Sequence, residues 1–164
     1  MKAHKGFTLI ELIIVIVVLG ILAVSAAPQF INFSGDAREA TLDGLKGAMN
    51  GAARSVYAKA AIQGEEDSSS YVTVSGVETV YGYPTALAAG ITAALQIETA
   101  DWDIAYTDNS DPGSTANTAR FSPAGINDSI TTTDHTTITE CYVEYIDVTT
   151  AGNFPAISVV TTGC

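Results

Sequence analysis

An acidic side chain lies inside a long apolar run near the start of this 164-residue sequence. Glu11 is followed by 24 uncharged residues, and the next charged residue is Asp36. Moving a carboxylate out of water is costly, so an acidic residue in such a segment is a candidate functional residue by default. The alternative role for Glu11 is structural. Its carboxyl group would reach the polar boundary of the segment, or stay protonated there, stabilised by the positive end of a helix dipole.

Two cysteines, Cys141 and Cys164, form the second candidate group. In an exported domain an even pair predicts one disulfide, whereas in a reducing compartment two free thiols are expected. The residues around them are typical of β-strands. In an antiparallel hairpin with Cys141 opposite Cys164, Tyr145 would face Val160. Directly opposed residues of such a pair lie within reach of a disulfide, and this register predicts the bond.

A group of aspartates could suggest calcium: Asp101, Asp103, Asp108 and Asp111. The EF-hand spacing with its glycine is absent, so a solvated acidic loop is the preferred interpretation, and calcium binding there stays open. Two cysteines and His135 cannot supply the four ligands of a zinc site. We therefore predict no metal site and no cofactor, and the absence of a catalytic constellation predicts no catalytic residue.

The charge balance limits the partners of the chain. It carries 18 acidic and 7 basic side chains, for a net charge of −11. An acidic surface repels phosphate backbones, so direct binding of nucleic acid is not expected.

The apolar run that contains Glu11 is long enough to cross a membrane. Residues 7–27 would extend about 31 Å as a helix, close to the ~30 Å hydrocarbon core of a bilayer. Lys2 and Lys5 precede the run, which places the N-terminus in the cytoplasm by the positive-inside rule. A cleaved secretory signal is the alternative, with the Ser-Ala-Ala before Pro28 as its cleavage site.

Apolar residues continue beyond the run, now at the three- and four-residue spacing of an amphipathic helix over residues 30–62. We predict one long helix over residues 7–64. Gly20 and Pro28 interrupt its first half, because glycine is a poor helix former and proline lacks an amide proton. Gly44, Gly47 and Gly51 are expected to face the sheet of the following domain.

Residues 65–164 form the predicted head. Short β-branched and aromatic runs alternate there with Gly, Pro, Asn and Asp clusters, which is typical of a small antiparallel sheet. The strongest strand signal lies over residues 137–148. The predicted fold class is α+β, with the second half of the long helix packed on this sheet.

The heptapeptide Gly6-Phe7-Thr8-Leu9-Ile10-Glu11-Leu12 resembles the processing signature of type IV prepilins, and the six-residue leader resembles that of the type IVa subclass. The resemblance implies that prepilin peptidase removes residues 1–6 by cutting between Gly6 and Phe7, and that the new Phe7 amine is N-methylated. It implies that Glu11 attracts the Phe7 amine of a neighbouring subunit during assembly. The spacing of Gly20 and Pro28 is similar to the softened helix segment of the family.

A second resemblance concerns the head. The motif Gly82-Tyr83-Pro84, and the segment from Cys141-Tyr142-Val143 to Gly163-Cys164, are similar to mannose-sensitive haemagglutinin pilins. The family resemblance implies a non-enzymatic subunit with a pilin fold and a C-terminal disulfide hairpin. It would polymerise with itself into an extracellular adhesive filament, after an inner-membrane stage and with the help of the pilus assembly machinery. The alternatives are a type II secretion pseudopilin with a calcium-binding head, and a secreted or anchored protein of another class.

Overall fold

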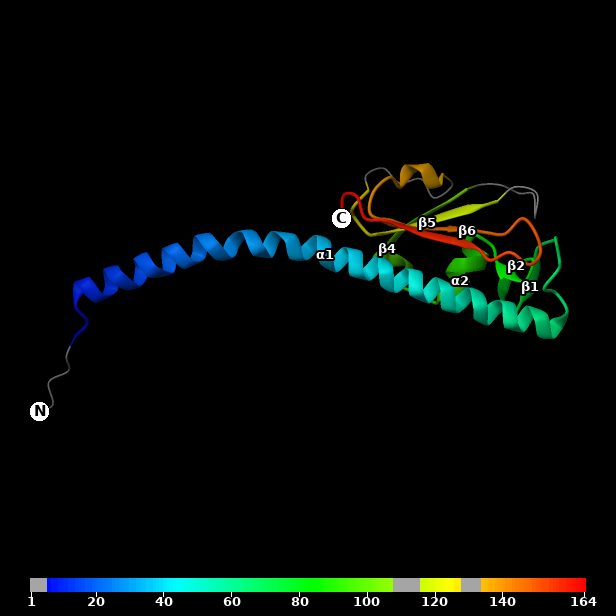
Figure 1. Cartoon of the computed structure of the whole chain (residues 1–164), viewed down its shortest axis with the longest axis horizontal. Helices are drawn as coiled ribbons and strands as arrows, with labels where there is room; N and C mark the ends of the chain where they lie inside the picture. Colours follow the sequence, from blue (N-terminus) through cyan, green and yellow to red (C-terminus); the bar gives the residue numbers. More distant parts are fainter. Residues whose placement is uncertain (1–5, 108–115, 128–133) are drawn as a thin grey trace, which may run out of the picture. The chain divides into compact units, whose positions relative to one another are not determined.

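The computed structural model describes residues 6–107, 116–127 and 134–164, and of residues 25–32 it describes the backbone alone (Figure 1). The chain divides into two compact units, the first ending at Ala37 and the second spanning Arg38–Cys164. Each unit is described below by itself.

One long helix is followed by short strands, as the sequence predicts. The described elements are, in chain order, α1 Leu9–Gln63, β1 Val72–Val74, β2 Val77–Val80, β3 Tyr83–Pro84, the π-helix η1 Ala88–Thr92, α2 Ala93–Leu95, the 3₁₀ helix η2 Thr99–Asp101, β4 Trp102–Tyr106, β5 Thr118–Pro123, the 3₁₀ helix η3 His135–Thr137, β6 Tyr142–Ile146 and β7 Ala156–Val160. The predicted α+β class is confirmed.

Helix α1 ends at Gln63, directly before a glycine. Gly64 has a positive φ of 75°. Its amide donates to the carbonyl of Ala61 at 3.3 Å, and the amide of Glu65 donates to that of Ala60 at 3.0 Å. This pair of bonds is a Schellman motif, which satisfies carbonyls of the last turn and favours glycine at the left-handed position. In the single chain α1 continues through Gly20 and Pro28.

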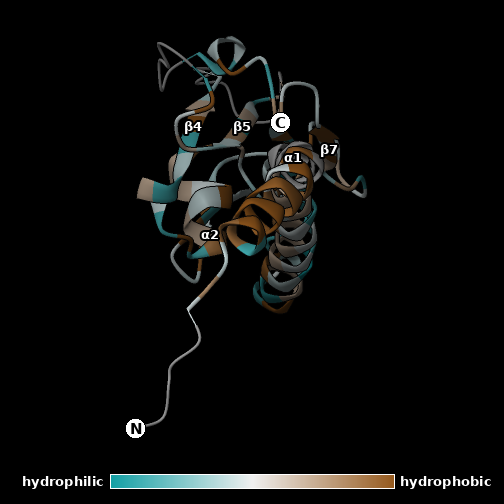
Figure 2. Ribbon diagram, turned by 90° about the vertical axis from the view of Figure 1, so that its left-hand side faces the viewer, coloured by the Kyte–Doolittle hydropathy of each residue, from teal (hydrophilic) through white to brown (hydrophobic). Residues whose placement is uncertain are grey.

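The first unit exposes the apolar residues of α1 along its whole described length. Phe7 is 89% exposed and Leu9 is 75% exposed, and the large apolar side chains that follow, up to Val24, are exposed as well. Figure 2 shows much of this part of α1 in brown, the hydrophobic end of the colour scale. Within the described residues, no helix meets the combined length and hydropathy required to cross a membrane.

The second unit buries one stripe of α1 against the sheet. Leu42, Leu45 and Met49 are buried in one cluster with Phe121 and Tyr145, which confirms the predicted amphipathic face for this part of α1. Phe33, earlier on the helix, is 60% exposed. The expectation for the three helix glycines is wrong. Those at 44, 47 and 51 lie on the exposed face, and a Cβ atom there would meet nothing within 4 Å. Leucine and methionine bury far more apolar area than glycine does, so they determine which face packs.

The strands form two antiparallel sheets, one of order β1-β2-β3 and one of order β4-β5-β6-β7. Strands β1 and β2 form a hairpin whose turn contains Ser75 and Gly76, with φ values of 53° and 86°. Strand β5 was not predicted from the sequence. The long strand expected over residues 137–148 is wrong at its start, because η3 precedes it and β6 begins only at Tyr142.

The predicted register of the last hairpin is also wrong. Tyr145 pairs with Ile157 and not with Val160, a difference of three residues. An odd shift exchanges the two faces of a strand. In the observed register Ile157 and Val159 pack against the core cluster, whereas the predicted one would have turned Ser158 toward it. Burial of the two larger apolar side chains explains the difference.

Candidate functional site

The carboxylate of Glu11 caps the first turn of α1. Glu11 Oε2 accepts hydrogen bonds from the amide of Thr8 at 2.9 Å and from its hydroxyl at 2.7 Å. In return the amide of Glu11 donates to Thr8 Oγ1 at 3.4 Å. This reciprocal arrangement is a capping box, which satisfies amides that have no partner within the helix. Glu11 is therefore oriented by its own chain, and its carboxylate remains exposed.

The capping contact of Thr8 is not predicted in the sequence analysis, although its signal is present in the sequence. The spacing Thr-x-x-Glu before an apolar run is the sequence pattern of a capping box. The sequence analysis treats Glu11 as a charge in an apolar segment and not as the partner of a threonine three residues earlier.

The predicted cleavage position lies just before this cap. Gly6, Phe7 and Thr8 precede the first residue of α1 and are exposed. A Cβ atom on Gly6 would meet nothing within 4 Å in the single chain. An exposed, non-helical peptide bond is the form that a peptidase requires, because an extended backbone must enter its site.

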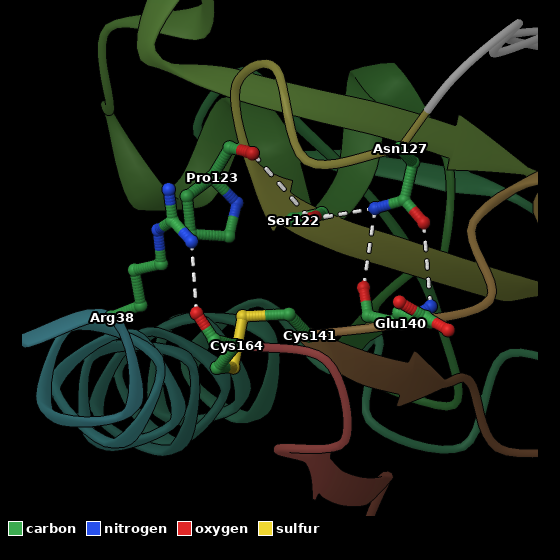
Figure 3. Close-up of a disulfide and its surroundings, with 7 residues drawn as sticks. All are labelled: Arg38, Ser122, Pro123, Asn127, Glu140, Cys141 and Cys164. Carbon is green, nitrogen blue, oxygen red and sulfur yellow. Dashed lines mark hydrogen bonds between the residues drawn. A yellow bond between two sulfur atoms is a disulfide. The ribbon is translucent and has the colours of Figure 1, made fainter. Parts of the chain in front are cut away.

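At the other end of the sequence, Cys141 and Cys164 form the predicted disulfide, with Cα atoms 4.9 Å apart (Figure 3). The two residues lie outside the β6–β7 ladder. Cys141 has a positive φ of 52°, and its amide donates to the carbonyl of Thr162 at 2.9 Å. A turn then returns the chain, with the Cys164 amide bonded to Thr161 O at 3.1 Å and Gly163 at a φ of 78°. The turn, and not a straight strand, brings Cys164 to its partner.

Two polar side chains hold the segments on either side of the disulfide (Figure 3). Asn127 Nδ2 donates to Ser122 Oγ at 2.8 Å and to the Glu140 carbonyl at 3.1 Å, while Asn127 Oδ1 accepts from the amides of Thr139 and Glu140. Arg38 Nη1 donates to the main-chain oxygen of Cys164 at 2.8 Å. The second half of α1 is thus joined directly to the end of the sequence.

The aspartates considered for calcium are only partly described. Asp103 Oδ2 accepts a hydrogen bond from the Gly125 amide at 2.8 Å, so it stabilises the turn after β5. Asp108 and Asp111 lie outside the described residues. Among the described residues, no group of three or more His, Cys, Asp or Glu side chains could hold a metal ion.

A buried carboxylate joins three segments of the head. Asp147 is 6% exposed and accepts hydrogen bonds from the Asn117 amide at 2.7 Å, from Asn117 Nδ2 at 3.0 Å and from the Ala86 amide at 3.4 Å. Burial raises the pKa of Asp147, and these hydrogen bonds oppose the rise. The neighbouring Tyr145 hydroxyl donates to Pro84 O at 2.8 Å. These hydrogen bonds of Asp147 and Tyr145 are structural, because they connect the segment before η1 to the four-stranded sheet.

Comparison with known proteins bears on the N-terminal segment. Residues 1–27 match the family model described as the prokaryotic N-terminal methylation motif. The chain carries this motif. The match confirms the resemblance of residues 6–12 to the prepilin signature, whereas it does not extend to the head.

Similar chains are pilus and fimbrial subunits. The type IV narrow pilus major component PilA5 of Thermus thermophilus is 48% identical over 59 residues, which are 36% of this chain and 47% of that protein. Two fimbrial proteins of Pseudomonas aeruginosa are 59% identical over 34 residues, which are 21% of this chain and 22% of each protein. The similarity thus spans about half of the first relative and about a fifth of the others. No solved structure matches the chain.

Proposed function

We propose that this chain is a structural subunit of a type IV pilus, and that it has no enzymatic activity. In this proposal prepilin peptidase removes residues 1–6, Phe7 becomes the methylated N-terminus, and the subunits polymerise into an extracellular filament that serves adhesion and biofilm formation. The methylation motif over residues 1–27 and the pilus and fimbrial relatives support the assignment. They favour a pilin over a secretion pseudopilin.

The observation that carries the proposal is the uncovered apolar surface of α1. Every large apolar side chain from Phe7 to Val24 that the structure describes is exposed. Monomeric soluble proteins rarely expose apolar patches of this extent, so the surface needs a partner. We propose the lipid of the inner membrane before assembly, through residues 7–27, and the helices of neighbouring subunits afterwards.

Glu11 has two tasks in this proposal. It caps its own helix through Thr8, and it attracts the Phe7 amine of the next subunit. Cleavage creates that amine four residues before Glu11, and a carboxylate and an ammonium group attract each other strongly where water is excluded. Each charge alone would be costly there, so both gain from the pairing.

The two tasks of Glu11 are separable by substitution. Glu11→Gln removes the charge and keeps an amide that can complete a capping box, whereas Thr8→Val removes the cap and keeps the charge. We expect Glu11→Gln to leave a processed, disulfide-bonded chain in the membrane with few or no filaments, and Thr8→Val to retain filaments. Sheared cell-surface fractions examined by immunoblotting and electron microscopy give the readout. Wild-type filament numbers with Glu11→Gln would refute the pairing.

Processing is tested by the mass of the subunit. Filaments should contain a chain of 158 residues that begins with methylated Phe7, the 164 residues of the sequence without the first six. Intact-mass spectrometry that found residues 1–6 still attached would overturn the proposed cleavage, and a mature chain that begins at Pro28 or Gln29 would indicate a secreted protein instead.

Gly20 and Pro28 are proposed to soften the helix in the filament. In lipid an unpaired amide is costly, so a stretched segment becomes tolerable only when protein surrounds it. The continuous α1 of the single chain is compatible with a change that occurs on assembly. A filament map with regular helix through both residues would contradict this part of the proposal.

For the head we propose a subtype similar to mannose-sensitive haemagglutinin pilins. Both motifs behind this proposal are held by contacts in the fold. Tyr83 stacks on Tyr57 with ring centroids 4.5 Å apart, Pro84 O accepts the hydrogen bond of Tyr145, and Cys141 is bonded to Cys164. Agglutination of erythrocytes by purified filaments, blocked by mannose, is the expected result. Filaments that do not agglutinate erythrocytes would contradict the subtype.

A further inference from the structure

The positive charges of this chain are concentrated on helix α1. Residues 65–164 contain 14 acidic side chains and one basic side chain, Arg120. Arg120 is already paired, because its Nε lies 2.7 Å from Glu144 Oε2. All other basic residues beyond the leader lie on α1. The head is therefore strongly acidic, and apart from Arg120 the basic residues that could balance its charge are on the helix.

Beyond Arg38 the charges of α1 are separated by sign along the axis. Two acidic residues, Glu39 and Asp43, come first, and then Lys46, Arg54 and Lys59 follow with no acidic residue up to the end of the helix. We call residues 46–59 the basic stretch. Arg54 lies over the ring of Phe154, with its Cζ atom 5.6 Å from the centroid. In the described part of the chain, the Arg120–Glu144 pair is the only salt bridge, so Lys46 and Lys59 have no ionic partner there.

Acidic side chains gather at the other end of the second unit, in the region of Arg38. Arg38 binds the Cys164 oxygen, and Cys164 is bonded to Cys141 next to Glu140 (Figure 3). Hydrogen bonds join this region to the start of β4. Asn127 Nδ2 donates to the Glu140 carbonyl. The amide of Ala124 donates to the Asp101 carbonyl, and the amide of Gly125 donates to the Asp103 carboxylate. We call this region, which contains Glu98, Asp101, Asp103 and Glu140, the acidic end. The single described cation there, Arg38, is bound to a main-chain oxygen.

The two charged regions are too far apart to neutralise each other within one chain. Lys46 lies 8 residues after Arg38 and Lys59 lies 21 residues after it, which corresponds to about 12 Å and about 32 Å along a helix. The screening length at physiological ionic strength is about 8 Å. The basic stretch is also accessible, because Lys59 is exposed and no atom lies within 4 Å of a Cβ position at Gly47 or Gly51.

We infer that the basic stretch of α1 is a docking surface for a second copy of this chain, which binds through its acidic end. The inference deepens the proposed function, on which it rests, by naming a contact between subunits beyond the apolar helices. The contact joins two different surfaces. In a pair of copies, each contributes one of these surfaces and keeps the other free for a further copy. Such a heterologous contact extends into an open polymer when its rotation does not close. Complementary charge also steers the approach of the incoming copy and determines its register.

The test uses charge reversal in the full chain. Lys46→Glu with Lys59→Glu makes the basic stretch acidic, and Glu98→Lys with Asp101→Lys makes the acidic end basic. Asp67→Lys is the control, since Asp67 is an exposed carboxylate in the loop beyond α1, outside both regions. The amount of chain in sheared filaments is measured at low and high salt. A disulfide assay and circular dichroism of the membrane-resident chain check that each variant is folded.

We expect each double reversal to lower the filament yield by about tenfold or more, since like charges then face each other, and the control to retain the wild-type yield. Co-expression of the two double variants should restore filaments, because the reversed stretch of one then meets the reversed end of the other. Restoration excludes misfolding as the cause of the loss.

Folded double variants that assemble at the wild-type yield would overturn this inference and leave the proposed function intact. Losses that co-expression does not restore would overturn it too. Wild-type cells without filaments would instead overturn the proposed function.

Discussion

Removal of the Cys141–Cys164 disulfide should destabilise the head without changing its native structure. Other contacts hold the two segments that the disulfide joins. These are the β6–β7 ladder, the hydrogen bond from the Cys141 amide to Thr162 O, and the hydrogen bond from Arg38 to Cys164 O. The effect should therefore arise mainly in the unfolded chain, which gains conformational freedom when the cross-link is lost. The double variant Cys141→Ala/Cys164→Ala is the perturbation.

The magnitude follows from the length of the closed loop. The two cysteines are 23 residues apart. For a loop of this size, the chain-entropy model predicts that removal of the cross-link lowers the free energy of unfolding by about 3.5 kcal/mol. The entropy of a unit of residues 38–164 rises by roughly 270 cal/mol/K on unfolding. A loss of this size in the free energy of unfolding therefore corresponds to a fall in Tm of about 13 °C. That is a large part of the typical stability of a domain, which is about 5–15 kcal/mol.

The fluorescence of Trp102 provides the assay. It is the single tryptophan of the chain and packs against the core cluster of the head. Urea unfolding of the full chain in detergent should give a lower midpoint for the double variant, with an unchanged native spectrum. The reduced wild-type chain is the matched control, because it keeps both sulfur atoms and loses only the cross-link.

Two results would refute the reasoning. A difference in unfolding free energy below about 1 kcal/mol between oxidised and reduced wild type would mean that the unfolded chain is not the state that the bond restrains. A native spectrum that changes on reduction would mean that the disulfide maintains the fold itself, and that the remaining contacts of Cys141 and Cys164 are insufficient.

Three further predictions concern the head of the full chain in detergent. Because burial raises the pKa of Asp147 above its ordinary 3.8, the folded state binds the proton more tightly, so the free energy of unfolding falls as pH rises from 3.8 through the raised pKa. Asp147→Asn should remove this slope in a pH series of urea unfolding, and an unchanged slope would contradict it. Gly90→Ala should destabilise by more than 2 kcal/mol because a Cβ there would collide with the backbone of the preceding segment, whereas Gly51→Ala on the open helix face should stabilise by about 0.5–1 kcal/mol, both measured by urea unfolding. Equal effects of the two glycine substitutions would refute the packing argument. Tyr145→Phe should cost about 1–3 kcal/mol, since it leaves the buried Pro84 carbonyl without its hydrogen bond, and a neutral result would mean that water replaces the hydroxyl.

Local interactions explain what was predicted correctly from the sequence. The long helix depends on propensity and on the Gly64 cap, both of which act within a few residues. The N-terminal motif was recognisable because its residues are consecutive, and the pairing of Cys141 with Cys164 because the chain has no other cysteine.

Contacts between segments distant in the sequence determine the features of the fold that were not predicted from the sequence. The register of β7 depends on which of its faces is buried, and Ile157 and Val159 face the core only because β6 and α1 meet there. For the same reason the face of α1 that carries Gly51 is exposed, since large apolar side chains on the other face bury more area. The burial of Asp147 arises from segments 30 and 61 residues away along the chain. A sequence gives the residues of such contacts but not their neighbours, because their energies depend on the folded arrangement of the whole head.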